Sequence, residues 1–238
     1  MAQPYHPAYI TVGGIFIDDI VFPDGRTAMG VLGGGVTHSA AGMVIWGQRP
    51  GMVAVAGRGL PPDVLLRLQR DFDLDGLQWL DIPQIRAWQL FEHDGHRTEV
   101  YRVEVTEPFI IGPQLERLPL SYRGARGIHL LRDDSIGPWR EALPGMTLLW
   151  EPAQQFMTPE NARAFRAALP QVDIVSPNWI EAQAVYGFAE PEALVRAMLD
   201  DGAPVAVVRL GEQGSIAGRQ GDPQFVCVPA VPVPRIVD

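Results

Sequence analysis

The chain has 238 residues, of which 47% are hydrophobic and 20% charged, and its formal net charge is −9. That length is ample for one large α/β domain, and the acidic balance argues against a surface for nucleic acid or an anionic membrane, which would need a basic patch. No apolar run reaches the roughly 18 residues of a membrane span. Residues 1–9 lack the basic and apolar regions of a secretory signal, so we expect none. The single cysteine, Cys227, excludes an internal disulfide and a cysteine-built zinc site, so we expect a cytoplasmic protein.

All 19 basic residues are arginine, and the chain contains no lysine. This absence excludes a Walker A loop, a pyridoxal Schiff base and the lysine of a protein kinase. Any phosphate group must therefore be bound by helix N-termini, glycine amides, arginine or a metal ion.

The first third of the chain predicts core elements separated by an exposed hairpin. Residues 17–32 mix polar and apolar side chains around Pro23-Asp24-Gly25, which is typical of an exposed hairpin. A helix of small residues follows Gly33-Gly34-Gly35. The core elements are expected as strands at 9–12 and 52–56 and as helices at 36–46 and 62–72.

A second hairpin is predicted at 85–105, because Asp94-Gly95 suits the positive φ angles of a tight turn between two alternating segments. From residue 127 onward, strands alternate with helices, which predicts a parallel sheet with helices on both faces. The two hairpins do not fit that sheet, so we expect a small separate sheet from residues 15–32 and 85–105. The alternative is a doubly wound domain with both hairpins inside the main sheet. The later elements are expected as strands at 127–131, 147–150, 172–175 and 205–209, helices at 159–169, 178 onward and 190–199, and a closing hairpin at 215–228.

Asn178 and Glu181 follow the predicted strand at 172–175 and Pro177. Asn is a good N-cap, and Glu three residues later completes a near capping box, so a well-capped helix is the simpler interpretation. The functional interpretation is that an amide and a carboxylate lie at the carboxyl end of a sheet strand, where α/β folds bind ligands. A carboxylate there could hold Mg²⁺, directly or through water, next to phosphates.

Other polar residues admit two interpretations each. Asp18 and Asp19, after the first strand, are either solvated turn residues or acceptors for sugar hydroxyls. His38 is either a packing residue or a ligand contact. The glycines at 33–35 lack the GxGxxG spacing of a dinucleotide site, and the loop 210–214 is either a turn or an opening for a nucleotide.

Taken in chain order, these segments resemble the ribokinase-like (PfkB) family of carbohydrate kinases. Each motif is weak alone, but several in the right order and spacing are hard to produce by accident. The combination of residues 15–19 with residues 33–37 is similar to a branch related to fungal killer-maintenance proteins. The motifs are the first strand with Asp18, Gly33-Gly34 with its helix, Asn178-x-x-Glu181, and the loop Arg209 to Gly214.

The resemblance implies a ribokinase-like three-layer α/β/α fold with a parallel central sheet and a small β lid, formed by one domain over residues 1–238. It implies an ATP-dependent transfer of phosphate to a hydroxyl of a sugar or nucleoside-like substrate, with Mg²⁺, and a possible homodimer through the lid. Asp18, Gly34 and His38 would line the substrate site. Glu181 would organise the metal, and Asn178, Arg209, Gly211 and Gly214 would border the nucleotide.

The chain departs from the family pattern near the sugar, where His38 replaces an asparagine and Arg58 replaces an aspartate. Residues 232–238 resemble the run-in to the family's C-terminal signature, so the resemblance implies that the catalytic base lies beyond Asp238. The 238 residues alone are therefore expected to lack significant kinase activity. The alternative function is a non-catalytic ligand-binding or scaffold protein on the same fold.

Overall fold

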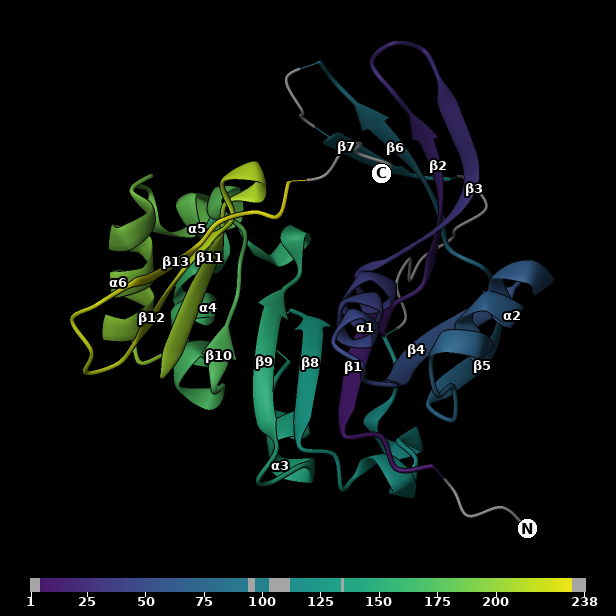
Figure 1. Cartoon of the computed structure of the whole chain (residues 1–238), viewed down its shortest axis with the longest axis horizontal. Helices are drawn as coiled ribbons and strands as arrows, with labels where there is room; N and C mark the ends of the chain where they lie inside the picture. The colour runs from purple at the N-terminus through teal and green to yellow at the C-terminus, as the bar shows by residue number, and fades with distance from the viewer. Residues whose placement is uncertain (1–4, 94–96, 103–111, 134, 233–238) are drawn as a thin grey trace. The chain divides into compact units, whose positions relative to one another are not determined.

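The computed structural model describes residues 5–93, 97–102, 112–133 and 135–232. The chain divides into two compact units, residues 1–125 and residues 126–237, which are described in turn below (Figure 1).

The N-terminal unit contains a parallel sheet in the order β1 (Tyr9–Gly14), β4 (Gly51–Arg58) and β5 (Leu77–Pro83). Its helices are α1 (Gly35–Ile45) and α2 (Pro62–Asp71). Both helices contribute to one apolar cluster with alternate residues of β4, because a strand presents every second side chain to the same face. The buried members include Val36 and Ala40 of α1, Val64 and Leu68 of α2, and Met52, Ala54 and Ala56 of β4.

A second, small sheet belongs to the same unit and has the order β3-β2-β6-β7 (Figure 1). Its strands are β2 (Phe16–Val21), β3 (Thr27–Gly33), β6 (Arg86–Phe91) and β7 (Arg97–Tyr101). The two hairpins β2–β3 and β6–β7 are antiparallel, and a parallel pairing of β2 with β6 joins them. The predicted separate small sheet is therefore present; Asp94, Gly95 and residues 103–105 of the expected segments lie outside the described residues.

The C-terminal unit contains a mixed sheet in the order β8-β9-β10-β11-β12-β13. Its parallel strands are β8 (Gly127–Arg132), β9 (Thr147–Pro152), β10 (Ile174–Val175) and β11 (Val205–Arg209). Two antiparallel strands extend the sheet beyond β11, namely β12 (Ser215–Arg219) and β13 (Val226–Val228). Trp150 of β9 packs in the core with a ring-centroid distance of 5.4 Å to Phe165. The α-helices are α3 (Gly137–Ala142), α4 (Ala162–Ala168), α5 (Trp179–Tyr186) and α6 (Pro191–Asp200).

The helix predicted at 159–169 is a composite of α4 and flanking 3-10 turns, and the strand predicted at 172–175 shortens to two residues. Asp173 leaves the strand pattern because its carboxylate accepts hydrogen bonds from the Leu148 amide and the Arg140 guanidinium, both at 2.7 Å. The 3-10 turns span Leu115–Arg117, Leu120–Tyr122, Gln154–Phe156, Pro159–Asn161, Leu169–Gln171 and Gly211–Gln213.

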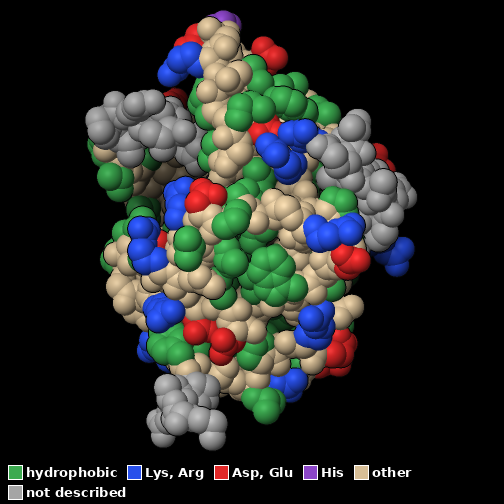
Figure 2. All heavy atoms as spheres, turned by 90° about the vertical axis from the view of Figure 1, so that its right-hand side faces the viewer, with side chains coloured by type: hydrophobic (Ala, Val, Ile, Leu, Met, Phe, Trp, Pro, Cys, Tyr) green, Lys and Arg blue, Asp and Glu red, His purple; other side chains and the backbone are tan. Residues whose placement is uncertain are grey.

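The sequence interpretation missed β5 because this edge strand inverts the usual polarity pattern. Its buried face carries Gln78, whose amide exchanges two 2.8 Å hydrogen bonds with the backbone of Gln114. Its outer face exposes Trp79, at 51% of its full accessible area. The face shown in Figure 2 has hydrophobic side chains between charged ones.

The predicted α/β class, with a mostly parallel sheet, surrounding helices and a small separate β sheet, is confirmed. Among the described residues, no helix is long and apolar enough to cross a membrane.

Candidate functional site

A carboxamide between two carboxylates lies on one face of the small sheet. Gln89 Nε2 donates to Asp18 Oδ1 and to Glu99 Oε1, both at 3.1 Å. The strand register explains the grouping, because Gln89 is directly opposite Glu99 and one pleat away from the Asp18–Ala87 pair. Burial raises the pKa of the Asp18 carboxyl, and the nearby Glu99 raises it further, whereas Gln89, Arg97 and His38 act in the opposite direction. We call Asp18, Gln89 and Glu99 the Asp18 cluster.

Asp19 lies on the opposite face of the same strand and has a different role. Its fully buried carboxylate accepts hydrogen bonds from the Gly30 amide at 2.9 Å, from Arg86 at 2.8 and 3.0 Å, and from Arg102 at 2.9 Å. Burial by itself would raise the pKa of Asp19, but these hydrogen bonds outweigh it and lower the pKa. Asp19 therefore joins the strands of the small sheet and is satisfied by protein groups.

The turn into α1 brings Gly33, Gly34 and His38 to the Asp18 cluster. A Cβ atom at Gly33 would collide with the Asp18 carboxylate, so only glycine leaves that carboxylate in place. Gly34, the residue before α1, has φ of 92°, and a Cβ there would approach the Phe16 nitrogen to 2.9 Å. His38 is exposed on α1, and its charge lowers the Asp18 pKa. The structure thus places the three predicted substrate-site residues, Asp18, Gly34 and His38, together; their role stays a prediction.

Asn178 and Glu181 form a complete capping box at the start of α5. The Asn178 side-chain oxygen accepts from the Glu181 amide, and the Glu181 carboxylate accepts from the Asn178 amide, each at 2.8 Å. The simpler interpretation of this pair is confirmed in full. Glu181 is nevertheless buried, with 8% of its surface exposed, which is rare for a carboxylate unless it is paired.

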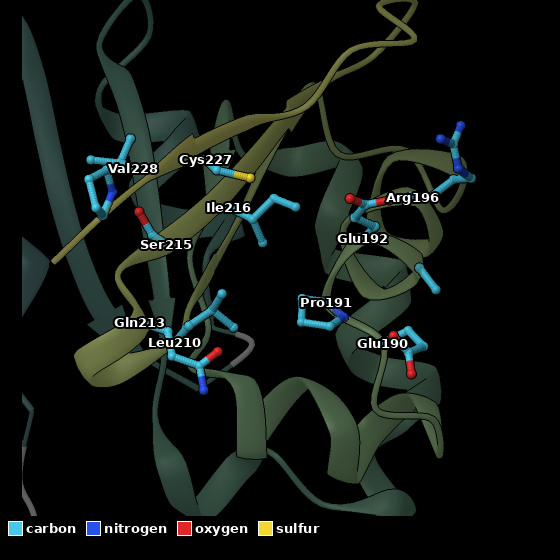
Figure 3. Close-up of a pocket in the computed structure, with 12 residues that line it drawn as sticks. Glu190, Pro191, Glu192, Arg196, Leu210, Gln213, Ser215, Ile216, Cys227 and Val228 are labelled. Carbon is cyan, nitrogen blue, oxygen red and sulfur yellow. The ribbon is translucent and has the colours of Figure 1, made fainter.

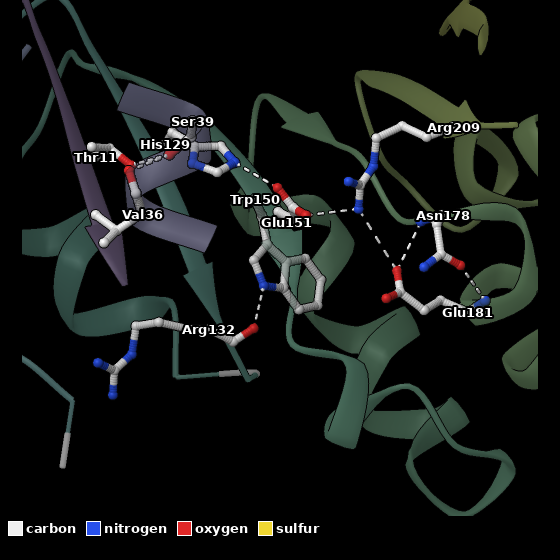
Figure 4. Close-up of polar contacts among 10 residues, drawn as sticks. All are labelled: Thr11, Val36, Ser39, His129, Arg132, Trp150, Glu151, Asn178, Glu181 and Arg209. Carbon is white, nitrogen blue, oxygen red and sulfur yellow. Dashed lines mark hydrogen bonds and ion pairs between the residues drawn. The ribbon is translucent and has the colours of Figure 1, made fainter. Parts of the chain in front are cut away.

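The guanidinium of Arg209 lies between two carboxylates of the C-terminal unit (Figure 4). Its Nη2 is 2.8 Å from Glu151 Oε1 and 3.8 Å from Glu181 Oε2. A backbone bridge fixes this position, because the Arg209 amide donates to the Pro177 carbonyl at 3.1 Å, beside Asn178. The buried Arg209 Nε has no hydrogen-bond acceptor among the described residues.

Glu151 connects this arginine to His129. His129 Nε2 is 2.9 Å from Glu151 Oε2, and both side chains are largely buried. Burial alone would raise the pKa of Glu151, but the His129 hydrogen bond and the Arg209 charge outweigh it and lower the pKa. Glu151 therefore stays ionised and holds Arg209 in place.

The loop after β11 begins at Arg209 and turns at two glycines. Gly211 has φ of 60° with no atom within 4 Å of a hypothetical Cβ, so a ligand can approach its backbone. Gly214 has φ of 92°, and a Cβ there would clash with the Val228 carbonyl. A cleft of about 740 Å³ adjoins this loop, between α6 and the β12–β13 hairpin (Figure 3). Leu210, Pro191 and Ile216 supply apolar lining, and the exposed Cys227 lies on its β13 side.

The contacts of Glu151 and Glu181 indicate whether these residues could hold a metal ion. No group of three or more metal-binding side chains occurs among the described residues. Mg²⁺ in phosphate-transfer sites is commonly held by one or two carboxylates plus phosphate and water, and Glu181 with Glu151 matches that set. The residues present therefore fit Mg²⁺ bound together with a phosphate ligand, rather than a metal held by protein alone.

Sequence reasoning missed Gln89, Glu99, His129 and Glu151. Glu151 had a usable signal, because it is a charged residue directly after the predicted apolar strand at 147–150. His129 lies inside an apolar strand and Gln89 and Glu99 depend on the pairing of β6 with β7, so their grouping required the register.

Comparisons with known proteins show a similarity to one family of kinases. Residues 152–238 match the pfkB family carbohydrate kinase. That stretch of the chain is similar to the pfkB family carbohydrate kinases. It is 27% identical over 233 residues to a cytidine kinase of Thermococcus kodakarensis, covering 94% of this chain and 79% of that protein. The predicted resemblance to the pfkB family is thus confirmed, whereas the narrower killer-maintenance branch stays a prediction.

Solved structures show the same ribokinase-like fold. A ribokinase-like protein of E. coli in complex with ATP and Mg²⁺ has a TM-score of 0.74 at 16% identity, covering 97% of this chain and 80% of that one. A nucleoside kinase of Burkholderia thailandensis in complex with inosine has a TM-score of 0.73 at 15% identity, covering 97% and 78%. At these identities the likeness establishes the fold alone.

Proposed function

We propose that the protein is an ATP-dependent, Mg²⁺-requiring phosphotransferase acting on a hydroxyl group of a sugar or nucleoside-like substrate. The family match and the similarity to a cytidine kinase support a kinase. The narrower assignments, to substrate, metal and residues, rest on the geometry of the two groups of polar side chains.

The Asp18 cluster suits the hydroxyl substrate. Ionised carboxylates are hydrogen-bond acceptors only, so Asp18 and Glu99 bind O–H donors and repel anions. Gly33 accommodates the Asp18 carboxylate, which a Cβ at that position would displace, and His38 borders the cluster from α1. The chain's own residues thereby orient a neutral polyhydroxyl compound.

The residues around Arg209 suit the phosphates. Arg209 supplies a fixed guanidinium, the backbone at Gly211 is open to a ligand, and the adjoining cleft has room for a nucleoside-sized group. The start of α5 at Asn178 adds amide groups and a positive dipole end. When bound, Mg²⁺ would neutralise the phosphate charge, and Glu181 and Glu151 are the carboxylates that would hold it.

The observation that carries this proposal is the position of Arg209 between Glu151 and Glu181. Arg209 is a fixed cation beside two carboxylates, so a phosphate-binding group and carboxylates that could hold a metal lie in one place.

The test compares the Glu181→Gln variant with the unmodified protein. Calorimetry measures MgATP binding, and a coupled assay measures ADP release over a panel of sugars and nucleosides. We expect Glu181→Gln to lower phosphoryl transfer at least about a hundredfold, because charge neutralisation dominates this chemistry. Glu141→Gln, on the exposed face of α3, is the matched control and should leave transfer unchanged.

Two results would contradict the proposal. Unchanged transfer in Glu181→Gln would remove the metal role given to Glu181. Ligand binding without any transfer would support the non-catalytic alternative, which His38 and the exposed Arg58 at departing motif positions favour. The Arg58 side chain forms an ion pair with Asp81 at 3.2 Å.

A further inference from the structure

His129 is a buried polar side chain inside the apolar strand β8, and the proposed function gives it no role. Only 8% of its surface is exposed, and its Nε2 is 2.9 Å from Glu151 Oε2 on the neighbouring strand β9. An ionised carboxylate can only accept hydrogen bonds, so Nε2 carries the hydrogen and donates it to Glu151. Burying a polar ring is costly unless it is hydrogen-bonded, and this bond offsets that cost. His129 and Glu151 are therefore fixed relative to each other.

The hydrogen bond from His129 determines which way the Glu151 carboxylate faces. His129 engages Oε2, and Oε1 is the oxygen that lies 2.8 Å from Arg209 Nη2 (Figure 4). A carboxylate with both oxygens turned to an arginine forms a bidentate pair and occupies two of its nitrogens. Here Arg209 Nε has no acceptor among the described residues, so Glu151 holds the guanidinium through Nη2.

The Arg209 side chain crosses the end of the short strand β10 to meet Glu151. In the sheet, β10 lies between β9, which carries Glu151, and β11, which ends at Arg209. The pair therefore spans two strand spacings, or roughly 10 Å. Strand β10 ends at Val175, level with Trp150, so the arginine can pass over its end. Glu181 is farther from the guanidinium, at 3.8 Å, so Glu151 is the carboxylate that anchors it.

We propose that His129 is a positioning residue for phosphate binding, which holds Glu151 so that Arg209 is in place before a nucleotide binds. This inference rests on the proposed function, because it concerns the phosphate-binding arginine of the same site. With 41% of its side chain exposed, Arg209 can be reached by a ligand while Nη2 stays tethered. An arginine that is already ordered loses little conformational freedom when a phosphate binds, and this raises the affinity.

Two substitutions at His129 distinguish the hydrogen bond from the bulk of the ring. His129→Leu removes the donor, whereas His129→Gln keeps one, because the glutamine Nε2 is the same number of bonds from the backbone. We expect His129→Leu to weaken MgATP binding about tenfold, as measured by calorimetry, and His129→Gln to recover most of that loss. Urea denaturation verifies that each variant is folded.

Two controls distinguish positioning from a general structural role. Arg140→Leu breaks a charged contact with Asp173 in the same unit, at the amino ends of β9 and β10. It should lower stability in urea without changing MgATP affinity. In an Arg209→Met background, His129→Leu should cause no further loss of affinity, because its effect passes through the arginine.

The position of Arg209 can be measured without any nucleotide. Its Nε atom is buried, so the attached hydrogen exchanges slowly with water while the side chain stays in place. Nuclear magnetic resonance of arginine Nε–H groups detects this hydrogen, and the Arg209→Met variant identifies its signal. We expect exchange to become at least about tenfold faster in His129→Leu and to stay slow in His129→Gln.

Unchanged MgATP affinity in His129→Leu, or unchanged exchange of the Arg209 Nε hydrogen, overturns the inference. A loss of affinity that persists in the Arg209→Met background does so too, as does an unmodified protein that binds no MgATP. Failure of the proposed function is a different result, namely the absence of phosphoryl transfer. A protein that binds MgATP in a His129-dependent way but transfers no phosphate would support the inference and contradict the proposed function.

Discussion

Asp18 and Asp19 are consecutive carboxylates whose surroundings differ because a strand directs neighbouring side chains to opposite faces. Asp19 has an amide and two guanidiniums as partners, and its pKa is lowered. Asp18 is partly buried beside another acid, and its pKa is raised. Their sequence context is nearly identical. Only the register of β2 with β3 and β6 distinguishes Asp19, which has a structural role, from Asp18, which is a candidate ligand-binding residue.

Replacing Asp19 by Asn should destabilise the fold by about 2 kcal/mol. Breaking a fully buried ion pair costs about 3–5 kcal/mol, and the partial exposure of Arg86 and Arg102 reduces that cost. A lowered folded-state pKa means that Asp19 contributes stability above its unfolded pKa of about 3.9, and that this contribution is lost as pH falls through the folded value. Urea denaturation between pH 3 and 7 should show acid sensitivity that Asp19→Asn lacks.

Replacing Asp18 by Asn should leave the fold at least as stable at neutral pH while weakening polyol binding. A raised folded-state pKa means that the charged carboxyl opposes folding at pH 7. The unmodified protein should therefore gain stability as pH falls through that pKa, and Asp18→Asn should not. Urea denaturation of both proteins checks this, and a large loss of stability in Asp18→Asn at pH 7 would contradict it.

Replacing Gly33 by Ala should displace the Asp18 carboxylate and lower polyol affinity at least about tenfold. The φ angle at Gly33 lies outside the left-handed region, so the conflict is with Asp18 rather than with the backbone. Gly42→Ala is the matched control, because a Cβ in that part of α1 meets open space and should stabilise the helix by about 0.5–1 kcal/mol. Equal affinities in the two variants would argue against a ligand at Asp18.

At the scale of elements, helix α5 depends on its capping box. Asn178→Ala should cost about 1 kcal/mol of stability, because the Glu181 amide loses its acceptor, whereas Asn178→Ser should restore most of it. The same pair of variants distinguishes the capping role of Asn178 from its proposed role in nucleotide binding. If Asn178 also borders the nucleotide, MgATP affinity should fall in Asn178→Ser while stability recovers, and calorimetry beside urea denaturation measures both.

Elements that bury their apolar side chains and expose their polar ones could be predicted from the sequence. An element that buries a polar side chain and exposes an apolar one could not. The strand at 147–150 and the helix at 190–199 follow their apolar pattern, and the Pro23-Asp24-Gly25 segment marks a turn as expected. Strand β5 was missed because it buries Gln78 and exposes Trp79. Capping at Asn178 was readable from four residues, whereas the grouping of Arg209 with Glu151 depends on strand order, which no local pattern encodes.

At the scale of the whole molecule, the candidate polyol residues belong to the N-terminal unit and the candidate phosphate residues to the C-terminal unit. Each unit has its own apolar core, so each ligand should stabilise the backbone around its own residues first. The net charge of −9 makes a free nucleotide an unfavourable partner, so ATP should bind more tightly with Mg²⁺ than without it.

Hydrogen exchange of backbone amides should distinguish the candidate polyol residues from the candidate phosphate residues. We expect MgATP to slow exchange at residues 178–181 and 209–214, and a ribose-containing nucleoside to slow exchange in β2, β6 and β7 of the small sheet. Ligand binding protects an amide by lowering the population of the open state, so saturating ligand at a hundred times Kd should add about 2.7 kcal/mol of protection where opening requires release of the ligand. Protection by MgATP that is confined to the small sheet would contradict the assignment of Arg209, Gly211 and Gly214 to the nucleotide.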